Sequence, residues 1–264
     1  MLGFLRDRRR ARLLATPFPE EWRPYLHRFN WYRSLDAARR RRLEDLVRIF
    51  INEKQFEGCA GLVLTDEMKV VIAAQACLLL VGRVGADSDE LYPGLSTILV
   101  YPAAYRAVTK TIGPGGVVTE SDGVRLGESW NSTNGPGSGG PIVLSWSDVV
   151  AGSANEHDGR NVVLHEFAHQ LDAEAGGMDG APKLHGRSAY NAWARVFSGE
   201  FARLAHDLAA AHPHLINAYG ATNPPEFFAV VTEHFFEQPA LLREQHPDLY
   251  AQLASFYGQA PGGT

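Results

Sequence analysis

The chain has 264 residues, enough to bury a full core, and its hydrophobic content of 45% excludes wholesale disorder. Its 25 basic residues against 30 acidic ones give a formal net charge of −5, so general attraction to nucleic acid is not expected. The longest apolar run, at 70–82, contains Gln75 and is too short to span a bilayer. The arginine-rich start lacks the features of a secretory signal, and two cysteines offer no disulfide framework. We therefore expect a cytoplasmic protein with no membrane contact and no direct nucleic-acid partner.

Composition divides the chain into three parts. Residues 1–16 are rich in arginine and are expected to form a basic, flexible tail. Residues 17–261 are expected to form a single domain, with a mainly helical part at about 17–95, and 262–264 a second short tail. The proline-rich and aromatic stretch 17–32 predicts an irregular lead-in over the surface.

Capping residues and apolar periodicity predict most of the remaining elements. Helices are expected from a cap at Ser34 or Asp36 to about 53, at 65–79, 161–172 and 193–211, from about 225 onward, and at 241–257. Short apolar, β-branched runs predict strands at 62–65, 96–101 and 141–146.

A glycine-rich tract, 131–140, precedes the last of these strands. A strand beside a catalytic helix can pair with an extended peptide if one of its edges is open. We therefore predict that Ile142, Val143 and Leu144 bind substrate as a peptide rail. The alternative is an ordinary edge strand.

The stretch 161–172 reads N-V-V-L-H-E-F-A-H-Q-L-D and contains an H-E-x-x-H motif. On a helix, His165 and His169 lie on one face and can bind a single tetrahedral ion. Glu166 lies one position round the helix, where a general base must be to accept a proton from an activated water. This arrangement is typical of zinc hydrolases.

A catalytic zinc ion needs a third protein ligand. A third histidine of the H-E-x-x-H-x-x-G-x-x-H pattern is absent, because Asp172 and Ala175 occupy the glycine and histidine positions. The alternative is a carboxylate on a second helix, where Glu226 and Glu233 stand seven residues apart on one face. One can bind the metal and the other can support a ligand histidine. Spacing alone does not choose between them.

The chain resembles the Mlc titration factor A family of bacterial zinc metallopeptidases, from about Pro17 to Pro261. The resemblance rests on residues 53–56, 72–78, 100–102, 140–146, 165–172 and 219–236. Its most specific part is the combination of H-E-F-A-H-Q-L-D with Y-x-x-x-x-x-P-E-F-F-A-V-x-x-E. The glycine-rich tract looks longer than the corresponding family turn, and one hypothesis is that it covers or shapes the cleft.

In that family, and in the similar catalytic domain of anthrax lethal factor, the third ligand is a glutamate seven residues after a tyrosine that assists catalysis. Tyr219 and Glu226 have this spacing, so the resemblance implies Glu226 as the ligand and Tyr219 as a catalytic residue. Glu233 and Asp172 then become candidates to support the ligand histidines.

The resemblance also implies an α+β, zincin-like fold, with a small mixed sheet packed on helices that include the H-E-x-x-H helix. It implies one Zn²⁺ per chain, aminopeptidase-type activity on peptides, and binding to a glucose-responsive transcriptional repressor. In the expected mechanism Glu166 is the general base, and Tyr219 donates a hydrogen bond to the oxyanion. The alternative is a binding protein that sequesters the repressor and whose metal site is structural or regulatory.

Overall fold

The computed structural model describes residues 2–83, 91–103, 105–112, 118–125, 127–131 and 139–262. Its helical elements are α1 (Leu2–Leu14), η1 (Glu20–Trp22), α2 (Arg23–His27), α3 (Asn30–Ser34), α4 (Ala37–Glu53), α5 (Asp66–Leu78), α6 (Trp146–Ala154), α7 (Val162–Ala173), α8 (Arg187–Ala209), η3 (Ala218–Ala221), α9 (Pro224–Glu237), α10 (Pro239–Gln245) and α11 (Pro247–Tyr257). Its strands are β1 (Gln55–Gly58), β2 (Thr97–Tyr101), β3 (Tyr105–Ile112), β4 (Val118–Arg125), β5 (Gly127–Asn131) and β6 (Gly139–Ser145).

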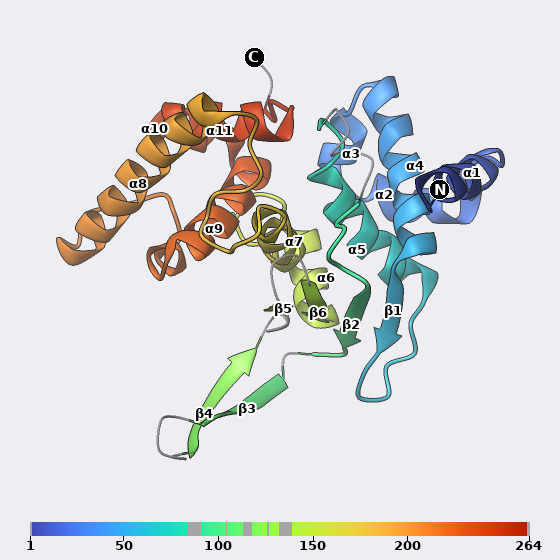
Figure 1. Cartoon of the computed structure of the whole chain (residues 1–264), viewed down its shortest axis with the longest axis horizontal. Coiled ribbons are helices and arrows are strands. Elements are labelled where there is room, and N and C mark those ends of the chain that lie inside the picture. The colour runs from blue at the N-terminus through green and yellow to red at the C-terminus, as the bar shows by residue number, and fades with distance from the viewer. Residues whose placement is uncertain are drawn as a thin grey trace.

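The main sheet is small and mixed. Its strand order is β1-β2-β6-β5, in which β1, β2 and β6 run parallel and β5 runs antiparallel to β6. Strands β3 and β4 form a separate antiparallel ribbon that projects from the body of the molecule (Figure 1). The expected α+β class with a mixed sheet is confirmed.

The expected peptide rail is wrong, because β6 has no open edge. Ile142 is in register with Ile98 of β2 on one side and with Ser129 of β5 on the other. The side chains of Ile142, Val143 and Leu144 are also buried. Strand β5 comes from a glycine-containing stretch without a clear alternating pattern, so the sequence did not reveal that it would cover this edge.

Helix α7 lies in the centre of the molecule, between the N-terminal helices and the C-terminal helices α8 to α11 (Figure 1). Phe167 on α7 packs against Phe50 of α4 and against Tyr92, with ring centroids 5.6 Å and 4.8 Å away. The apolar helix α5 is buried from Val70 to Leu78, as its sequence predicts. Burial of this aromatic and aliphatic cluster fixes α7 rigidly against its neighbours.

The N-terminus is helical, in contrast to the expected flexible tail. Residues 2–14 form α1, which packs on α4 through an ion pair of 2.7 Å between Arg10 and Glu53. Arg48 of α4 also donates to the carbonyl oxygens of Leu13 and Thr16 at the end of α1. Arginine, leucine and alanine favour helices, so this basic segment becomes a helix once its charges find partners.

Other local differences have simple causes. The stretch 17–32 contains η1, α2 and most of α3 rather than irregular chain, and the strand expected at 62–65 is absent, with β1 forming at Gln55–Gly58 instead. The helix expected at 241–257 is divided into α10 and α11, because Pro247 cannot continue a helix.

The other expected helices are confirmed, and Asp36, Thr65, Asn161 and Asn223 cap four of them. Positions 132–138 of the glycine-rich tract lie outside the described residues. Within the described part of the chain, none of the helices has the length and apolarity needed to span a membrane.

Candidate metal centre

The helix that carries the H-E-x-x-H motif begins at a buried asparagine. Asn161 Oδ1 accepts hydrogen bonds from the backbone N–H groups of Val163 and Leu164, both at 3.1 Å. Its Nδ2 donates to Gln75 Oε1 on α5 at 2.7 Å and to Glu237 Oε1 on α9 at 3.0 Å. Asn161 therefore fixes the start of α7 against both of these helices.

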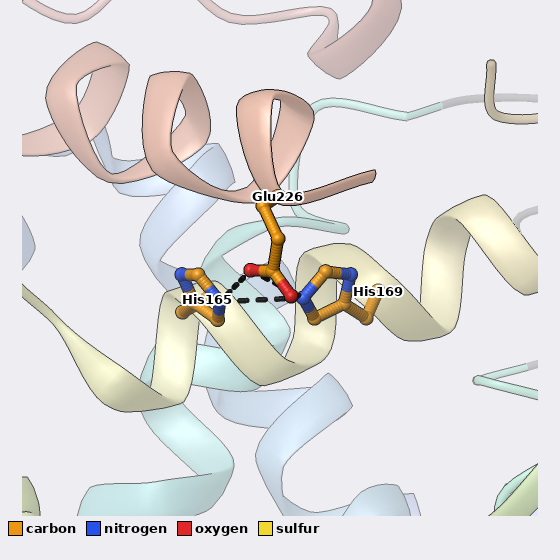
Figure 2. Close-up of side chains that lie close together, drawn as sticks. All are labelled: His165, His169 and Glu226. Carbon is orange, nitrogen blue, oxygen red and sulfur yellow. Dashed lines mark hydrogen bonds and ion pairs between the residues drawn. The ribbon is translucent and has the colours of Figure 1, made fainter. Parts of the chain in front are cut away.

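Three of the predicted ligands converge. His165 and His169 stand one turn apart on α7, and Glu226 reaches toward them from the first turn of α9 (Figure 2). Nε2 of His165 lies 3.0 Å from Oε2 of Glu226 and 3.2 Å from Nε2 of His169. Nε2 of His169 lies 3.4 Å from the same Glu226 oxygen. The three atoms form a nearly equilateral triangle.

This triangle has the size that a tetrahedral zinc ion requires. Zinc binds imidazole nitrogen and carboxylate oxygen at about 2.0–2.2 Å, so two ligand atoms of one tetrahedral ion lie about 3.3–3.6 Å apart. The observed separations of 3.0, 3.2 and 3.4 Å need only small adjustments. Two imidazole nitrogens and one carboxylate oxygen also form a donor set that suits zinc. The residues present therefore fit this ion.

Electrostatic coupling within the triangle is strong. Burial raises the pKa of Glu226, but hydrogen bonds with His165 and His169 outweigh it and bring that pKa down to about 2. Burial opposes protonation of His165, whereas hydrogen bonds with Glu226 and Glu233 raise its pKa well above the ordinary value. Glu226 is consequently a carboxylate at neutral pH, the form that binds a metal ion.

Glu233 contacts the far side of the His165 ring. Its Oε1 lies 2.8 Å from Nδ1 of His165, while its Oε2 accepts a hydrogen bond from the backbone N–H of Asn161. Glu226 and Glu233 thus touch opposite nitrogens of one imidazole. This geometry supports Glu226 as the ligand and Glu233 as the residue that orients the ring.

Glu166 is buried beside the triangle. Burial raises its pKa to about 7, and the charges of Glu226 and Glu233 add to this effect, although His165 opposes it. Its Oε2 is buried without a hydrogen-bond partner among the described residues. A carboxylate that titrates near neutral pH and has a free acceptor atom is well suited to exchange a proton with a reactant.

Asp172 holds the chain that follows α7. It is fully buried, and its Oδ2 accepts the backbone N–H of Gly180 at 2.8 Å. Its Oδ1 and Nδ1 of His169 are both buried without partners in the described part of the chain. The structure shows no hydrogen bond between these two described side chains, and support of His169 by Asp172 stays a prediction.

Tyr219 lies on η3, beside the triangle and open to solvent. Its ring centroid is 6.0 Å from that of His165, and 54% of the residue is exposed. The short turn η3 directly precedes α9, so the same segment of chain supplies both Tyr219 and Glu226. The tyrosine is therefore placed where a substrate entering from solvent would meet it.

A family model described as glucose-regulated metallo-peptidase M90 matches residues 5–258. The chain belongs to this family. A Synechocystis protein that carries only the description "uncharacterized" is 43% identical over 256 residues, which cover 97% of this chain and 90% of that protein. Mlc titration factor A of Serratia proteamaculans is 32% identical over 230 residues, covering 86% and 82% of the two chains. The same factor of Yersinia pestis is 30% identical over 230 residues, covering 86% and 80%.

These matches confirm the resemblance to the Mlc titration factor A family. They also make the chain a member of a metallopeptidase family, which implies peptide substrates and a metal ion. The triangle of His165, His169 and Glu226 is the candidate for the metal position in this M90 chain.

The sequence patterns do not identify several buried polar residues that support the start of α7 and therefore the candidate metal centre. Gln75 lies in the apolar helix α5, where its Nε2 donates to the carbonyl oxygen of Val71 and its Oε1 accepts from Nδ2 of Asn161. Glu237 accepts from both Asn161 and the backbone N–H of Arg160, at 3.0 and 2.9 Å. The only available signal was a row of polar residues inside apolar helices, which indicates a buried network without naming its partners.

A second group with metal-ligand chemistry lies on the surface. His206 and Asp207, in the last turn of α8, and His212, just after the helix, bring their ligand atoms within 4.8 Å of one another. Both imidazole Nδ1 atoms lie 3.5 Å from Oδ1 of Asp207. Unlike the α7–α9 triangle, this group is mainly exposed. It provides matched control positions for metal measurements on the M90 site.

Proposed function

We propose that this M90 family member is a zinc-dependent peptidase of the aminopeptidase type, with a zincin-like architecture, that acts in the cytoplasm. The observation that carries the proposal is the convergence of His165, His169 and Glu226 next to a buried oxygen of Glu166 that has no hydrogen-bond partner among the described residues. A structural site would need the three ligands but not a buried general base. In the proposed site these ligands hold one Zn²⁺ per chain.

In the proposed mechanism, separate residues of the chain transfer the proton, stabilise the oxyanion and orient a ligand. When bound at this site, zinc would supply Lewis acidity, which lowers the pKa of water to roughly 7 and polarises a carbonyl group. Glu166 accepts the proton of the attacking water and passes it to the leaving amine. The Tyr219 hydroxyl donates a hydrogen bond to the developing oxyanion, and Glu233 keeps His165 in its ligand orientation.

The experiment that tests this function combines metal analysis with peptide cleavage. Purified full chain is expected to contain one zinc ion, to release aminoacyl chromophores from short unblocked peptides, and to lose this activity reversibly to a chelator. His169→Ala is expected to lose both zinc and cleavage. The matched control, His212→Ala, removes an imidazole from the exposed group and should retain both. A fully active His169→Ala protein would overturn the proposal.

The aminopeptidase assignment has its own test. Amino-acetylated versions of the same peptides should resist cleavage if the free amino terminus is recognised. Equal cleavage of blocked and unblocked peptides would instead assign an endopeptidase.

A second candidate function is favoured by the names of the relatives. Proteins 32% and 30% identical to this chain are called Mlc titration factor A. We propose in parallel that this chain binds a glucose-responsive transcriptional repressor of the Mlc type. Normal repressor binding by His169→Ala, together with no turnover of any peptide by the zinc-loaded wild type, would favour sequestration over catalysis. Turnover that depends on Glu166 would favour the peptidase.

A further inference from the structure

A buried histidine on α9 holds the backbone of the segment that carries Tyr219. His234 is 3% exposed, and its Nε2 lies 3.1 Å from the backbone nitrogen of Asn217. Its Nδ1 lies 2.7 Å from Oε1 of Gln238. A backbone N–H can only donate, so Nε2 must be the unprotonated acceptor and Nδ1 must carry the proton that Gln238 accepts. The hydrogen bonds therefore select one neutral tautomer.

The ring is held in this position from its other side as well. Gln238 Nε2 donates to the carbonyl oxygen of His157 at 2.8 Å, which turns Oε1 of the same amide toward His234. Gly159 has a φ of +72°, and a Cβ there would come within 2.5 Å of the imidazole. Burial lowers the pKa of His234, which keeps the ring neutral. The loop between α6 and α7 therefore packs against the His234 ring.

The residue that His234 holds is the one that organises η3. Asn217 Oδ1 accepts the backbone N–H of Tyr219 at 3.0 Å. The carbonyl oxygen of Tyr219 in turn accepts the hydroxyl of Thr222 at 2.7 Å. Tyr219 itself is more than half exposed, and its ring centroid lies 6.0 Å from that of His165. The position of its side chain depends on the backbone of η3, and that backbone is tied to α9 at Asn217.

We propose that His234 is a positioning residue for Tyr219: by accepting the Asn217 N–H, it fixes η3 and keeps the tyrosine beside the His165, His169 and Glu226 triangle. The catalytic part of this inference rests on the proposed peptidase function, whereas the tether between His234 and Asn217 does not. In the described part of the chain, the hydrogen bonds of the His234 ring go to Asn217 and Gln238 rather than to His165, His169 or Glu226. The effect of His234 on kcat should pass through Tyr219, whereas its packing against the loop between α6 and α7 should affect stability.

The test is a double-mutant cycle with Tyr219→Phe. His234→Phe keeps a ring but removes the acceptor, and it should lower kcat about 10- to 100-fold, because a misplacement of about 1 Å can have this effect. KM and zinc content should not change. In the Tyr219→Phe background, His234→Phe should cause no further loss. His234→Gln, whose amide oxygen can accept the same N–H, should recover most of the activity.

Two results would overturn the inference. The first is a loss from His234→Phe that is fully additive with that of Tyr219→Phe, and the second is an unchanged kcat. Amide hydrogen exchange separates these outcomes from failure of the peptidase proposal. The Asn217 amide should be protected in the wild type and exchange much faster in His234→Phe, whether or not any peptide is cleaved. Equal exchange in the two proteins would refute the tether itself.

A second pair of variants covers the case in which His234→Phe does not fold. Asn217 has a φ of −55°, which proline can adopt, so Asn217→Pro removes the N–H without changing this angle. Asn217→Ala loses the same side-chain cap but keeps the N–H. Asn217→Pro should therefore have a kcat about tenfold or more below that of Asn217→Ala. Equal values for the two would count against the tether.

Discussion

Replacing Glu233 by glutamine should weaken zinc binding without removing a ligand. Glu233 currently accepts two hydrogen bonds, from Nδ1 of His165 at 2.8 Å and from the backbone N–H of Asn161. A glutamine amide has only one oxygen, so its NH₂ group must face one of these two donors. Either Nδ1 of His165 or the backbone N–H of Asn161, which caps α7, then loses its hydrogen-bond acceptor.

The size of the effect follows from these contacts. Loss of a carboxylate that orients a ligand histidine costs about 10- to 100-fold in metal affinity, which corresponds to about 1.4–2.7 kcal/mol. We therefore expect the Kd for zinc to rise by about this factor in Glu233→Gln. Competition against a chromophoric chelator at fixed pH measures the Kd directly.

The same helix provides a matched control. Glu237 lies about one turn further along α9, is also buried, and contacts Asn161 and Arg160 rather than His165. Glu237→Gln should leave the zinc Kd within about twofold of the wild type, since it removes no contact with a ligand. Unchanged zinc affinity in Glu233→Gln, or an equal loss in both variants, would refute the role given to Glu233.

Two further predictions concern stability. Asn161→Ala removes the cap of α7 and leaves Gln75 Oε1 without its donor, so the free energy of unfolding should fall by about 2–4 kcal/mol in urea titrations. A loss below about 0.5 kcal/mol would contradict the cap assignment. Burial raises the pKa of Glu237 from 4.5 to about 8, despite its hydrogen bonds with Asn161 and Arg160. The folded state keeps this proton while the unfolded state releases it, so stability should fall by up to about 1.4 kcal/mol per pH unit between those two values. Glu237→Gln should reduce the dependence of stability on pH in this range. A slope of stability against pH equal to that of the wild type would contradict the raised pKa of Glu237.

Much of the candidate metal centre could be predicted because its information is local. The i, i+4 spacing of His165 and His169 determines that both imidazoles lie on one face of α7. The choice between Glu226 and Glu233 could not be made in this way. Both face α7, and they contact the two nitrogens of the same His165 ring, so helical periodicity makes them equivalent. Only the resemblance to a known family separated them.

What the sequence did not reveal depends on contacts between distant segments. The pairing of β5 with β6 joins a glycine-containing stretch to an apolar strand, and it covers the edge that Ile142 to Leu144 seemed to offer. The docking of α1 depends on Glu53 and Arg48, which lie more than thirty positions from their partners. The bond between His234 and Asn217 requires a helix and a turn to be placed first. None of these contacts can be recognised from the periodicity of apolar residues in the sequence.

The role of Glu166 as general base can be decided by one pair of measurements on Glu166→Gln. The amide cannot accept a proton, but all three candidate ligands remain. We expect this variant to retain one zinc ion per chain while its cleavage of chromogenic peptides falls by about 10²- to 10⁴-fold. A zinc-loaded Glu166→Gln protein that cleaves peptides at the wild-type rate would contradict the proposed mechanism.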